Sequence, residues 1–255
     1  MLWPRPVQVA LDSLARLVRI EDIGTVPEVL LPSAGWQPRH EDHALDRQVR
    51  DECARLNWLD HRGQLDVDVA SALRVVCRAT TEFYGWITAG QTTTGVLAGR
   101  LGRQALLAVR RETSVSLCSI RSDNLATMVV AQTPDVPAGQ GKPARVQRSD
   151  ALAFDGGRPR PHGGLTVKPV PPDVRRLIQV AMLPRTGGGE FHVAVRDSMG
   201  RRVSSVDNVS YVDTAAGRYA TLTSTVDGDT ELLLIPTDQR DLVARLHETH
   251  HSLTR

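Results

Sequence analysis

The spacing of hydrophobic residues changes from a helical to a strand period, and this change occurs twice along the chain. Before residue 80, apolar side chains recur every three or four positions, which is typical of amphipathic helices. From Glu82 onward, aromatic and β-branched residues favour strands, and short connections containing Gly90 or Gly102 favour antiparallel pairing. Asp123 is expected to cap a further helix. The first half is therefore predicted to contain a short strand at 7–9, helices near 11–18, 46–58 and 67–78, strands at 81–88, 94–101, 104–110 and 114–120, and a helix at 123–132.

The second half follows the same order of elements. Apolar positions at helical spacing predict a helix over 173–183, between Pro172 and Pro184, after which Gly187-Gly188-Gly189 is expected to release the chain. Strands are then predicted at 190–197, 202–212, 218–226 and 231–235, followed by a helix at 237–251. The predicted fold class is α+β, with two helix-flanked antiparallel β-meanders related by an approximate twofold.

Residues 134–172 separate the two halves. They contain eight of the fifteen prolines, a density that disfavours packed elements and predicts a linker, with room for one short ordered piece at 146–154. We therefore expect a single domain over 1–255, with an N-terminal half at about 1–133 and a C-terminal half at about 173–255.

A turn between two predicted strands, from Tyr211 to Tyr219, is rich in polar residues. Asp213 and Thr214 can hydrogen-bond to nearby backbone amides, and Gly217 can adopt a positive φ without a Cβ clash. Arg218 and Tyr219 lead into the next strand. These residues are predicted to have a structural role, since the turn contains no recognisable nucleophile or metal-binding cluster.

Composition is that of a globular protein, with 41% hydrophobic and 24% charged residues. The net charge is only +2, and the basic residues are dispersed among acidic ones, so we expect no nucleic-acid partner. No apolar run approaches the ~20 residues that span a bilayer, so we expect no membrane insertion and a cytoplasmic location. Cys53, Cys77 and Cys118 are interpreted as small buried thiols, consistent with a reducing compartment.

One segment, His247-Glu248-Thr249-His250-His251, matches the H-E-x-x-H pattern of zinc hydrolases. It lies close to the end of the sequence, which leaves no room for a third ligand downstream, and histidines are favoured at a helix C-terminus by the helix dipole. The histidines of His40-Glu41-Asp42-His43 are interpreted as surface residues. The segment Gly139-Gln140-Gly141-Lys142-Pro143 lacks the spacing of a phosphate loop. We therefore expect no catalytic residue, no metal and no cofactor, with a zinc-dependent or other hydrolase as the alternative.

Aromatic residues mark the first predicted meander. Tyr84 and Trp86 share one face of their strand, and Phe83 and Ile87 share the other. The simpler interpretation is that one face packs beneath helices and the other is partly covered. The alternative is a binding sheet, in which Trp86 is rimmed by the polar residues Gln91, Thr92, Thr93 and Thr94.

Three segments, taken in this order, resemble the EspG-like family of ESX (type VII) secretion-associated proteins. They are Phe83-Tyr84-Gly85-Trp86-Ile87, Pro137-Ala138-Gly139 and Val212-Asp213-Thr214-Ala215-Ala216-Gly217-Arg218-Tyr219. The resemblance extends over about Val7 to His251.

The resemblance implies a non-enzymatic cytosolic chaperone of actinobacteria, which keeps helical secretion substrates of the PE/PPE heterodimer type soluble and delivers them for secretion. It implies client contacts at Gln91, Thr92, Thr93 and Thr94, in the loop after the Trp86 strand, joined by elements of the C-terminal half. A homodimer is left open. A structural component of the secretion machinery is the second alternative.

Overall fold

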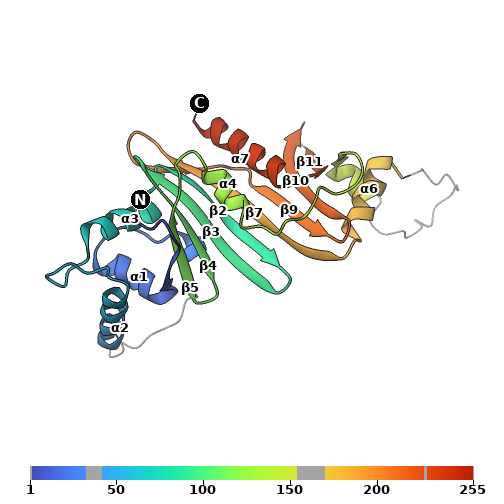
Figure 1. Cartoon of the computed structure of the whole chain (residues 1–255). Coiled ribbons are helices and arrows are strands. Elements are labelled where there is room, and N and C mark those ends of the chain that lie inside the picture. The colour runs from blue at the N-terminus through green and yellow to red at the C-terminus, as the bar shows by residue number, and fades with distance from the viewer. Residues whose placement is uncertain (1, 33–41, 154–169, 227–228, 255) are drawn as a thin grey trace.

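The computed structural model describes residues 2–32, 42–153, 170–226 and 229–254. These residues form an 11-stranded antiparallel sheet with helices on both faces (Figure 1). The strands are β1 (Val7–Ala10), β2 (Thr81–Ala89), β3 (Thr92–Leu101), β4 (Gln104–Arg111), β5 (Ser114–Ser119), β6 (Ala144–Gln147), β7 (Arg185–Arg196), β8 (Arg202–Ser204), β9 (Val209–Thr214), β10 (Gly217–Val226) and β11 (Asp229–Pro236). Their order across the sheet is β1-β5-β4-β3-β2-β7-β9-β10-β11-β6, with β8 pairing with β7.

The helices confirm the predicted α+β class. They are α1 (Leu11–Ile20), η1 (Glu28–Leu30), α2 (Asp42–Arg55), α3 (Val67–Arg78), α4 (Leu125–Val130), α5 (Arg148–Ala153), α6 (Pro172–Ala181) and α7 (Gln239–Leu253). Each half has a helix, a β-meander and a helix, with α3 and α4 flanking the first meander and α6 and α7 flanking the second. None of the helices in the described ranges is long and apolar enough to cross a membrane.

The two meanders are joined into one sheet by the pairing of β2 with β7. Thr81 lies opposite Val195 and Ala89 lies opposite Gly187, so β2 is paired along its whole length. Residues about 100 positions apart in the sequence therefore form the centre of the sheet. The meanders are continuous with each other and do not form separate layers.

Strand β7 includes Gly187-Gly188-Gly189, which the sequence analysis expected to release the chain. That expectation is wrong because the three glycines pair with β2 on one side and with β9 on the other. A Cβ atom at Gly189 would clash with the Trp86 carbonyl oxygen and would lie 2.9 Å from the Tyr211 ring. Glycine is required here by the close approach of neighbouring strands.

The segment expected to be a linker also contributes to the sheet. Ala144 and Val146 of β6 are buried while Arg145 and Gln147 are exposed, and the strand pairs with β11 at the edge. Helix α5 follows at Arg148–Ala153. High proline content therefore did not prevent a short strand with alternating burial from forming.

Two further boundaries differ from the prediction. The strand expected at 202–212 is divided into β8 and β9, which pair with successive parts of the same edge of β7. Helix α4 begins at Leu125 after Asn124, and the expected cap Asp123 instead binds Arg121 through two hydrogen bonds of 3.1 and 2.7 Å. The local ion pair therefore replaces the helix cap.

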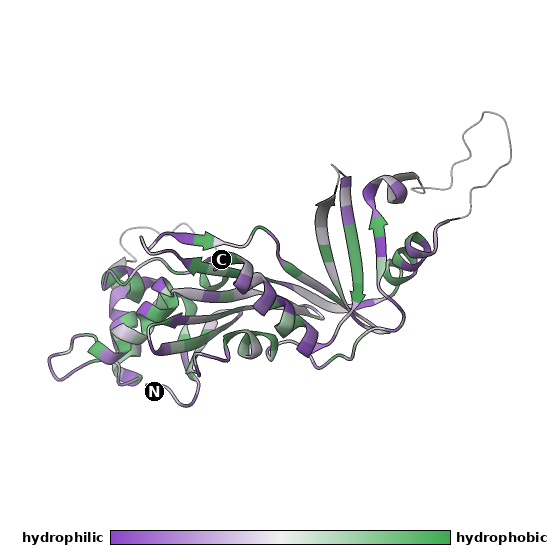
Figure 2. Ribbon diagram, turned by 90° about the horizontal axis from the view of Figure 1, so that it is seen from above, coloured by the Kyte–Doolittle hydropathy of each residue, from purple (hydrophilic) through white to green (hydrophobic). Residues whose placement is uncertain are grey.

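The helices cover the two faces of the sheet unequally. Helices α4 and α7 lie on one face, where Phe83, Phe191, Leu242 and Leu246 belong to one buried cluster (Figure 1). On the opposite face, α1, α2 and α3 pack at one end of the sheet, and α6 packs at the other end around Tyr219. Figure 2 shows these two groups of helices at opposite ends of the elongated molecule.

Both outer edges of the sheet are protected by carboxylates. The Ala10 amide of β1 donates to Glu52 Oε1 of α2 at 3.0 Å, and the Arg145 amide of β6 donates to Asp173 Oδ2 of α6 at 3.1 Å. An unpaired edge amide is a template for association with another strand. These contacts make each edge less available to a second chain.

We expect Asp173→Ala to increase self-association, because it frees the Arg145 amide at the β6 edge. The lost hydrogen bond should also lower the free energy of unfolding by about 1 kcal/mol. Light scattering over a range of concentrations measures the first effect and chemical denaturation the second. Asp207→Ala is the control, since Asp207 is exposed on the connection between β8 and β9. Equal association by both variants would contradict this role of Asp173.

Candidate functional site

The turn from Tyr211 to Tyr219 is organised by a buried ion pair. Asp213 of β9 lies opposite Arg218 of β10, so their side chains point to the same face of the sheet. Arg218 Nε donates to Asp213 Oδ1 at 2.6 Å, and Arg218 Nη2 donates to Asp213 Oδ2 at 3.0 Å. Arg218 is 0% exposed. Asp213 thus binds a guanidinium group, where the sequence analysis expected backbone amides.

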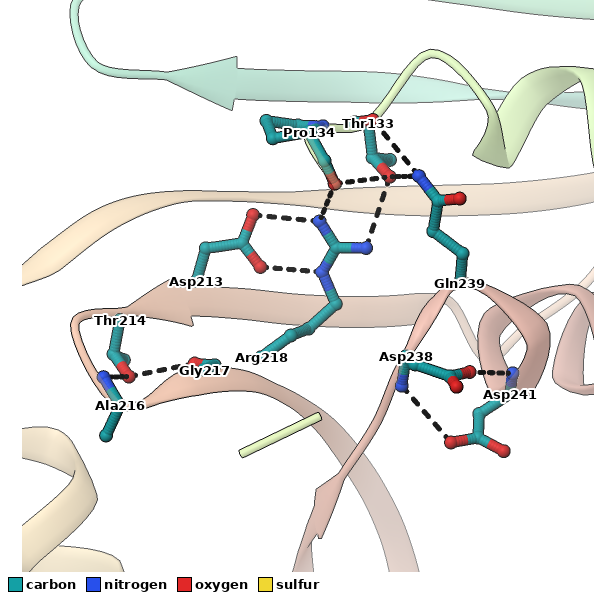
Figure 3. A network of polar contacts seen from close by, with 10 residues as sticks. All are labelled: Thr133, Pro134, Asp213, Thr214, Ala216, Gly217, Arg218, Asp238, Gln239 and Asp241. Atoms are coloured by element: carbon teal, nitrogen blue, oxygen red, sulfur yellow. Dashed lines mark hydrogen bonds and ion pairs between the residues drawn. The ribbon is translucent and has the colours of Figure 1, made fainter. Parts of the chain in front are cut away.

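The remaining guanidinium donors of Arg218 bind the segment that follows α4. Nη1 donates to Thr133 Oγ1 at 3.1 Å and Nη2 donates to the Pro134 carbonyl at 2.9 Å (Figure 3). Gln239, in the first turn of α7, donates from Nε2 to the Thr133 carbonyl at 3.2 Å. The guanidinium also lies 4.6 Å from the centroid of the Tyr211 ring. One side chain therefore connects the β9–β10 hairpin to the end of α4 and the start of α7.

The backbone of Arg218 connects a third segment. Its amide donates to the Pro137 carbonyl at 2.8 Å, and its carbonyl accepts from the Gly139 amide at 2.8 Å. Tyr219 is buried on the opposite face, directly beside Gly139. The Pro137-Ala138-Gly139 segment and the polar turn are thus packed against each other.

The turn itself consists of Ala215 and Ala216. Thr214 Oγ1 accepts from the Ala216 amide at 3.1 Å and donates to the Gly217 carbonyl at 2.8 Å. Gly217 has a φ of +108°, which favours glycine. These contacts join residues of the turn to one another.

The residues around Trp86 form a second site, on the other face of the sheet. The β2–β3 connection is only Gly90-Gln91, and β3 begins at Thr92, two residues before the strand predicted at 94–101. Thr92, Thr93 and Thr94 therefore all lie in β3. A pocket of about 230 Å³ is lined by Trp86, Gln91, Thr92, Thr93, Arg110 and Glu112. Thr94 is absent from this lining and pairs with Ile87, which is buried beneath the helices of the opposite face.

Trp86 is half-buried, with its ring fixed by neighbouring groups. It lies opposite Gly95 of β3, where a Cβ atom would clash with the Val29 carbonyl oxygen of η1 and would lie 3.0 Å from the indole ring. The Arg110 guanidinium lies 5.7 Å from the ring centroid, and Arg110 Nη1 donates to the Leu31 carbonyl at 2.6 Å. The ring is therefore preorganised and partly accessible, as suits an anchor for an apolar partner group.

Arg110 and Glu112 were not identified in the sequence analysis. They lie on the neighbouring β4–β5 hairpin, and the register places Arg110 opposite Gly95, which is itself opposite Trp86. The strand register of the predicted meander is the signal that places Arg110 beside Trp86. Glu112 has a φ of +49° in the turn after β4, which a hydrophobic pattern does not indicate.

Among the residues that the structure describes, the middle of this face is partly exposed. Cross-strand pairing places Trp86, Glu190 and Ser210 in one row and Thr88, Gly188 and Val212 in the next. In the parts of the chain that the structure describes, α7 packs on β7 and β9 from the other face, whereas on this face Val212 of β9 packs against the cluster that contains Val180 of α6. The result is a sheet surface between α1–α3 and α6, which we call the open face, defined by these two rows of residues.

Next to the open face, Tyr84 is enclosed by polar groups. Its ring stacks on His192 at a centroid distance of 5.3 Å, and the Arg202 guanidinium lies 4.9 Å from its centroid. Arg202 Nε donates to the buried Glu82 at 3.0 Å, and Glu82 also lies 3.9 Å from Arg196. The charge of Glu82 is therefore balanced inside the fold.

A larger cavity of about 420 Å³ lies at the other end of the first meander. It is lined by Leu2, Val75, Arg103 and Ile120, among others, and by the exposed Arg121–Asp123 pair. None of the predicted contact residues lines it. It contains no catalytic arrangement and lies outside the open face.

The histidines of the H-E-x-x-H segment pack on the sheet. The rings of His247 and His250 lie 6.2 and 5.7 Å from the Phe83 centroid, and His251 Nδ1 lies 2.7 Å from the His247 carbonyl oxygen. The described residues contain no group of three or more His, Cys, Asp or Glu side chains that could hold a metal ion. Of the second histidine segment, His40 and Glu41 lie outside the described residues.

Burial shifts the pKa values of a histidine and of two cysteines. It lowers the pKa of His250, as do the nearby charges of His251, Arg100 and His247. It raises the pKa of the Cys53 and Cys77 thiols to about 11. Thiols with such pKa values are poor nucleophiles near neutral pH.

Comparisons with known proteins identify the family. A family model described as the EspG family matches residues 10–248. Among solved structures, one that matches is the Mycobacterium tuberculosis type VII secretion system chaperone EspG5 in complex with a PE25–PPE41 dimer. It is 14% identical with a TM-score of 0.65, and the match covers 95% of each chain. This match confirms the fold. A comparison with curated protein sequences gives no match.

Replacement of Arg218 by methionine should destabilise the fold by about 3 kcal/mol or more, because Asp213 would remain as an unpaired buried charge. Chemical denaturation monitored by circular dichroism measures this change. Arg121→Met is the matched control, since it breaks an exposed pair with Asp123. Similar small effects of the two substitutions would show that the Arg218 pair does not hold the fold together.

Acidification should destabilise the docking of α7. A depressed pKa of His250 means that the unfolded state binds this proton more readily, so its contribution to stability is present above about pH 6.5 and is lost below it. His250→Gln is expected to flatten the fall in unfolding free energy between pH 7 and pH 5. His61→Gln, at an exposed position, is the control. An unchanged pH dependence in His250→Gln would refute the effect.

Proposed function

We propose that this chain, which belongs to the EspG family, is a chaperone of a type VII (ESX) secretion system that binds helical PE/PPE-like secretion substrates. It would keep them soluble and hold them for delivery. The observation that carries this proposal is the family match over residues 10–248, nearly the whole chain. The likeness in fold to a chaperone solved with a PE–PPE dimer supports it.

The client-binding site is proposed at the open face and the adjoining pocket, with contacts from Trp86, Gln91, Thr92 and Thr93. A half-buried tryptophan beside polar residues has the arrangement of a protein interface, in which an apolar anchor lies inside a polar rim. Thr94 is the weakest of the predicted contacts because its strand partner Ile87 faces the opposite core.

The proposed role requires only a binding surface. Holding a client in solution needs a preformed apolar patch that competes with the client's self-association, and it involves no covalent step. The packing of His247 and His250 against Phe83 gives these residues a structural role in place of a catalytic one. We therefore propose a non-enzymatic protein without a cofactor. Buried thiols of raised pKa suit the cytoplasm, where we place it.

We also propose that residues 1–255 form one domain, with halves at about 1–133 and 173–255 and a connecting segment at 134–172. The continuous sheet through β2 and β7 supports a single domain, because separate domains would not share one sheet. A domain with a single sheet would present a client with one rigid surface.

Co-expression with helical secretion substrates encoded by neighbouring genes tests the function. A substrate that is soluble only with this chain, and that co-elutes with it, is the expected result. A structural component of the machinery would leave the solubility of every substrate unchanged.

Trp86→Ala and Thr93→Arg should each weaken binding of that substrate, by on the order of 30-fold for Trp86 if it is a hot spot. Calorimetric titration measures the affinity, and unfolding curves confirm that each variant remains folded. Ser198→Arg, at an exposed turn after β7, adds the same side chain as Thr93→Arg away from the open face. Equal affinities of all three variants and the unmodified chain would exclude this binding site.

A further inference from the structure

The open face has a carboxylate at its centre. Glu190 of β7 lies between Trp86 of β2 and Ser210 of β9 in the register, so all three side chains point to the same side of the sheet. The side chain of Glu190 is 46% exposed. A charged group next to a preorganised tryptophan contributes to recognition as well as to solubility.

The carboxylate is held in place, but no arginine or lysine among the described residues forms an ion pair with it. Asn208 Nδ2 donates to Glu190 Oε2 at 3.1 Å, and His192 Nε2 lies 3.9 Å from Oε1. In the described ranges, the Glu190–His192 contact is the ion pair that Glu190 forms, and it is charged only when His192 is protonated.

Two arginines beside the open face make contacts with other groups. Arg202 binds the buried Glu82 at 3.0 Å, and Arg110 donates to the Leu31 carbonyl at 2.6 Å. On the other side of Trp86, the pocket contains a second carboxylate, Glu112. The Arg110 guanidinium shares that pocket with Glu112 and lies 5.7 Å from the Trp86 ring centroid. A partner with a cationic side chain would therefore complement Glu190, on the side of Trp86 away from Arg110.

The surface beside Glu190 allows close approach. Gly188, the next residue of β7 on this face, has no side chain, and its neighbours across the strands are Thr88 and Val212. A Cβ atom at Gly188 would lie 2.9 Å from the Tyr211 carbonyl oxygen of β9, so the close approach of the neighbouring strand favours glycine here and leaves this point of the face without a side chain. A helix lying over Gly188 would bring its side chains within reach of both Trp86 and Glu190.

We infer that the client segment on the open face is helical and carries a lysine or arginine that pairs with Glu190, next to an apolar residue that contacts Trp86. This inference rests on the proposed chaperone function and specifies the chemistry of its client. The ion pair selects among helical substrates, because a client with an acidic residue at this position would be repelled by Glu190.

The test uses the substrate obtained by co-expression and measures its affinity for the full chain at low and high salt. Glu190→Gln should weaken binding about fivefold at low salt and reduce the salt dependence, since a partly exposed pair contributes modestly. Glu190→Lys should weaken it further through repulsion. Ser210→Lys offers a second route, because a lysine opposite Glu190 would neutralise it within the chain and compete with the client.

Glu248→Gln, at an exposed position of α7 on the covered side of the sheet, is the matched control. The inference is supported if Glu190→Gln and Ser210→Lys weaken binding while Glu248→Gln does not. It is overturned if the substrate binds the Glu190→Gln and Glu190→Lys chains with unchanged affinity and salt dependence. Failure of the unmodified chain to bind any substrate would instead refute the chaperone function, and this inference with it.

Discussion

The buried pair of Arg218 and Asp213 is the constraint on which the rest of the structure depends. Removing two charges from water is costly, and this cost is offset only when the geometry is good and the remaining donors are satisfied. Here the guanidinium binds the carboxylate through two atoms, contacts Thr133 and the Pro134 carbonyl, and lies over Tyr211. Because Gln239 binds the same threonine, the pair also fixes where α7 starts. A hydrophobic pair could fill the space but would not specify these connections.

The position of α7 determines which face of the sheet remains available. With α4 and α7 on the centre of one face, and with α1–α3 and α6 at the two ends of the other, the central strands keep one side open. The pairing of β2 with β7 makes this side continuous across both halves, and the glycines of β7 allow the strands to approach closely. A partly exposed sheet with a fixed tryptophan, polar rows and protected edges suits binding of another protein while limiting aggregation.

Much of the fold could be predicted from local patterns, whereas the surface chemistry could not. Helical spacing located α3, and β-branched and aromatic runs located β2 to β5, because these signals depend on near neighbours. Gly187–Gly189 was misinterpreted because close strand approach is a tertiary property. Trp86 was recognised as a candidate from its alternation, but Arg110 and Glu190 reach the same face only through strand register. The family resemblance supplied the function, since no motif of catalysis or ligand binding in the sequence could have done so.

The central claim is that a helical client lies on the open face. Site-specific photo-cross-linking tests it most directly, with a photoreactive amino acid placed at Thr88 on the open face or at Glu248 on α7. Thr88 is exposed and lies beside Gly188, whereas Glu248 is exposed on the side of the sheet that α7 covers. The account predicts that the co-purified substrate cross-links from position 88 and not from position 248. Cross-linking from position 248 with none from position 88 would contradict it.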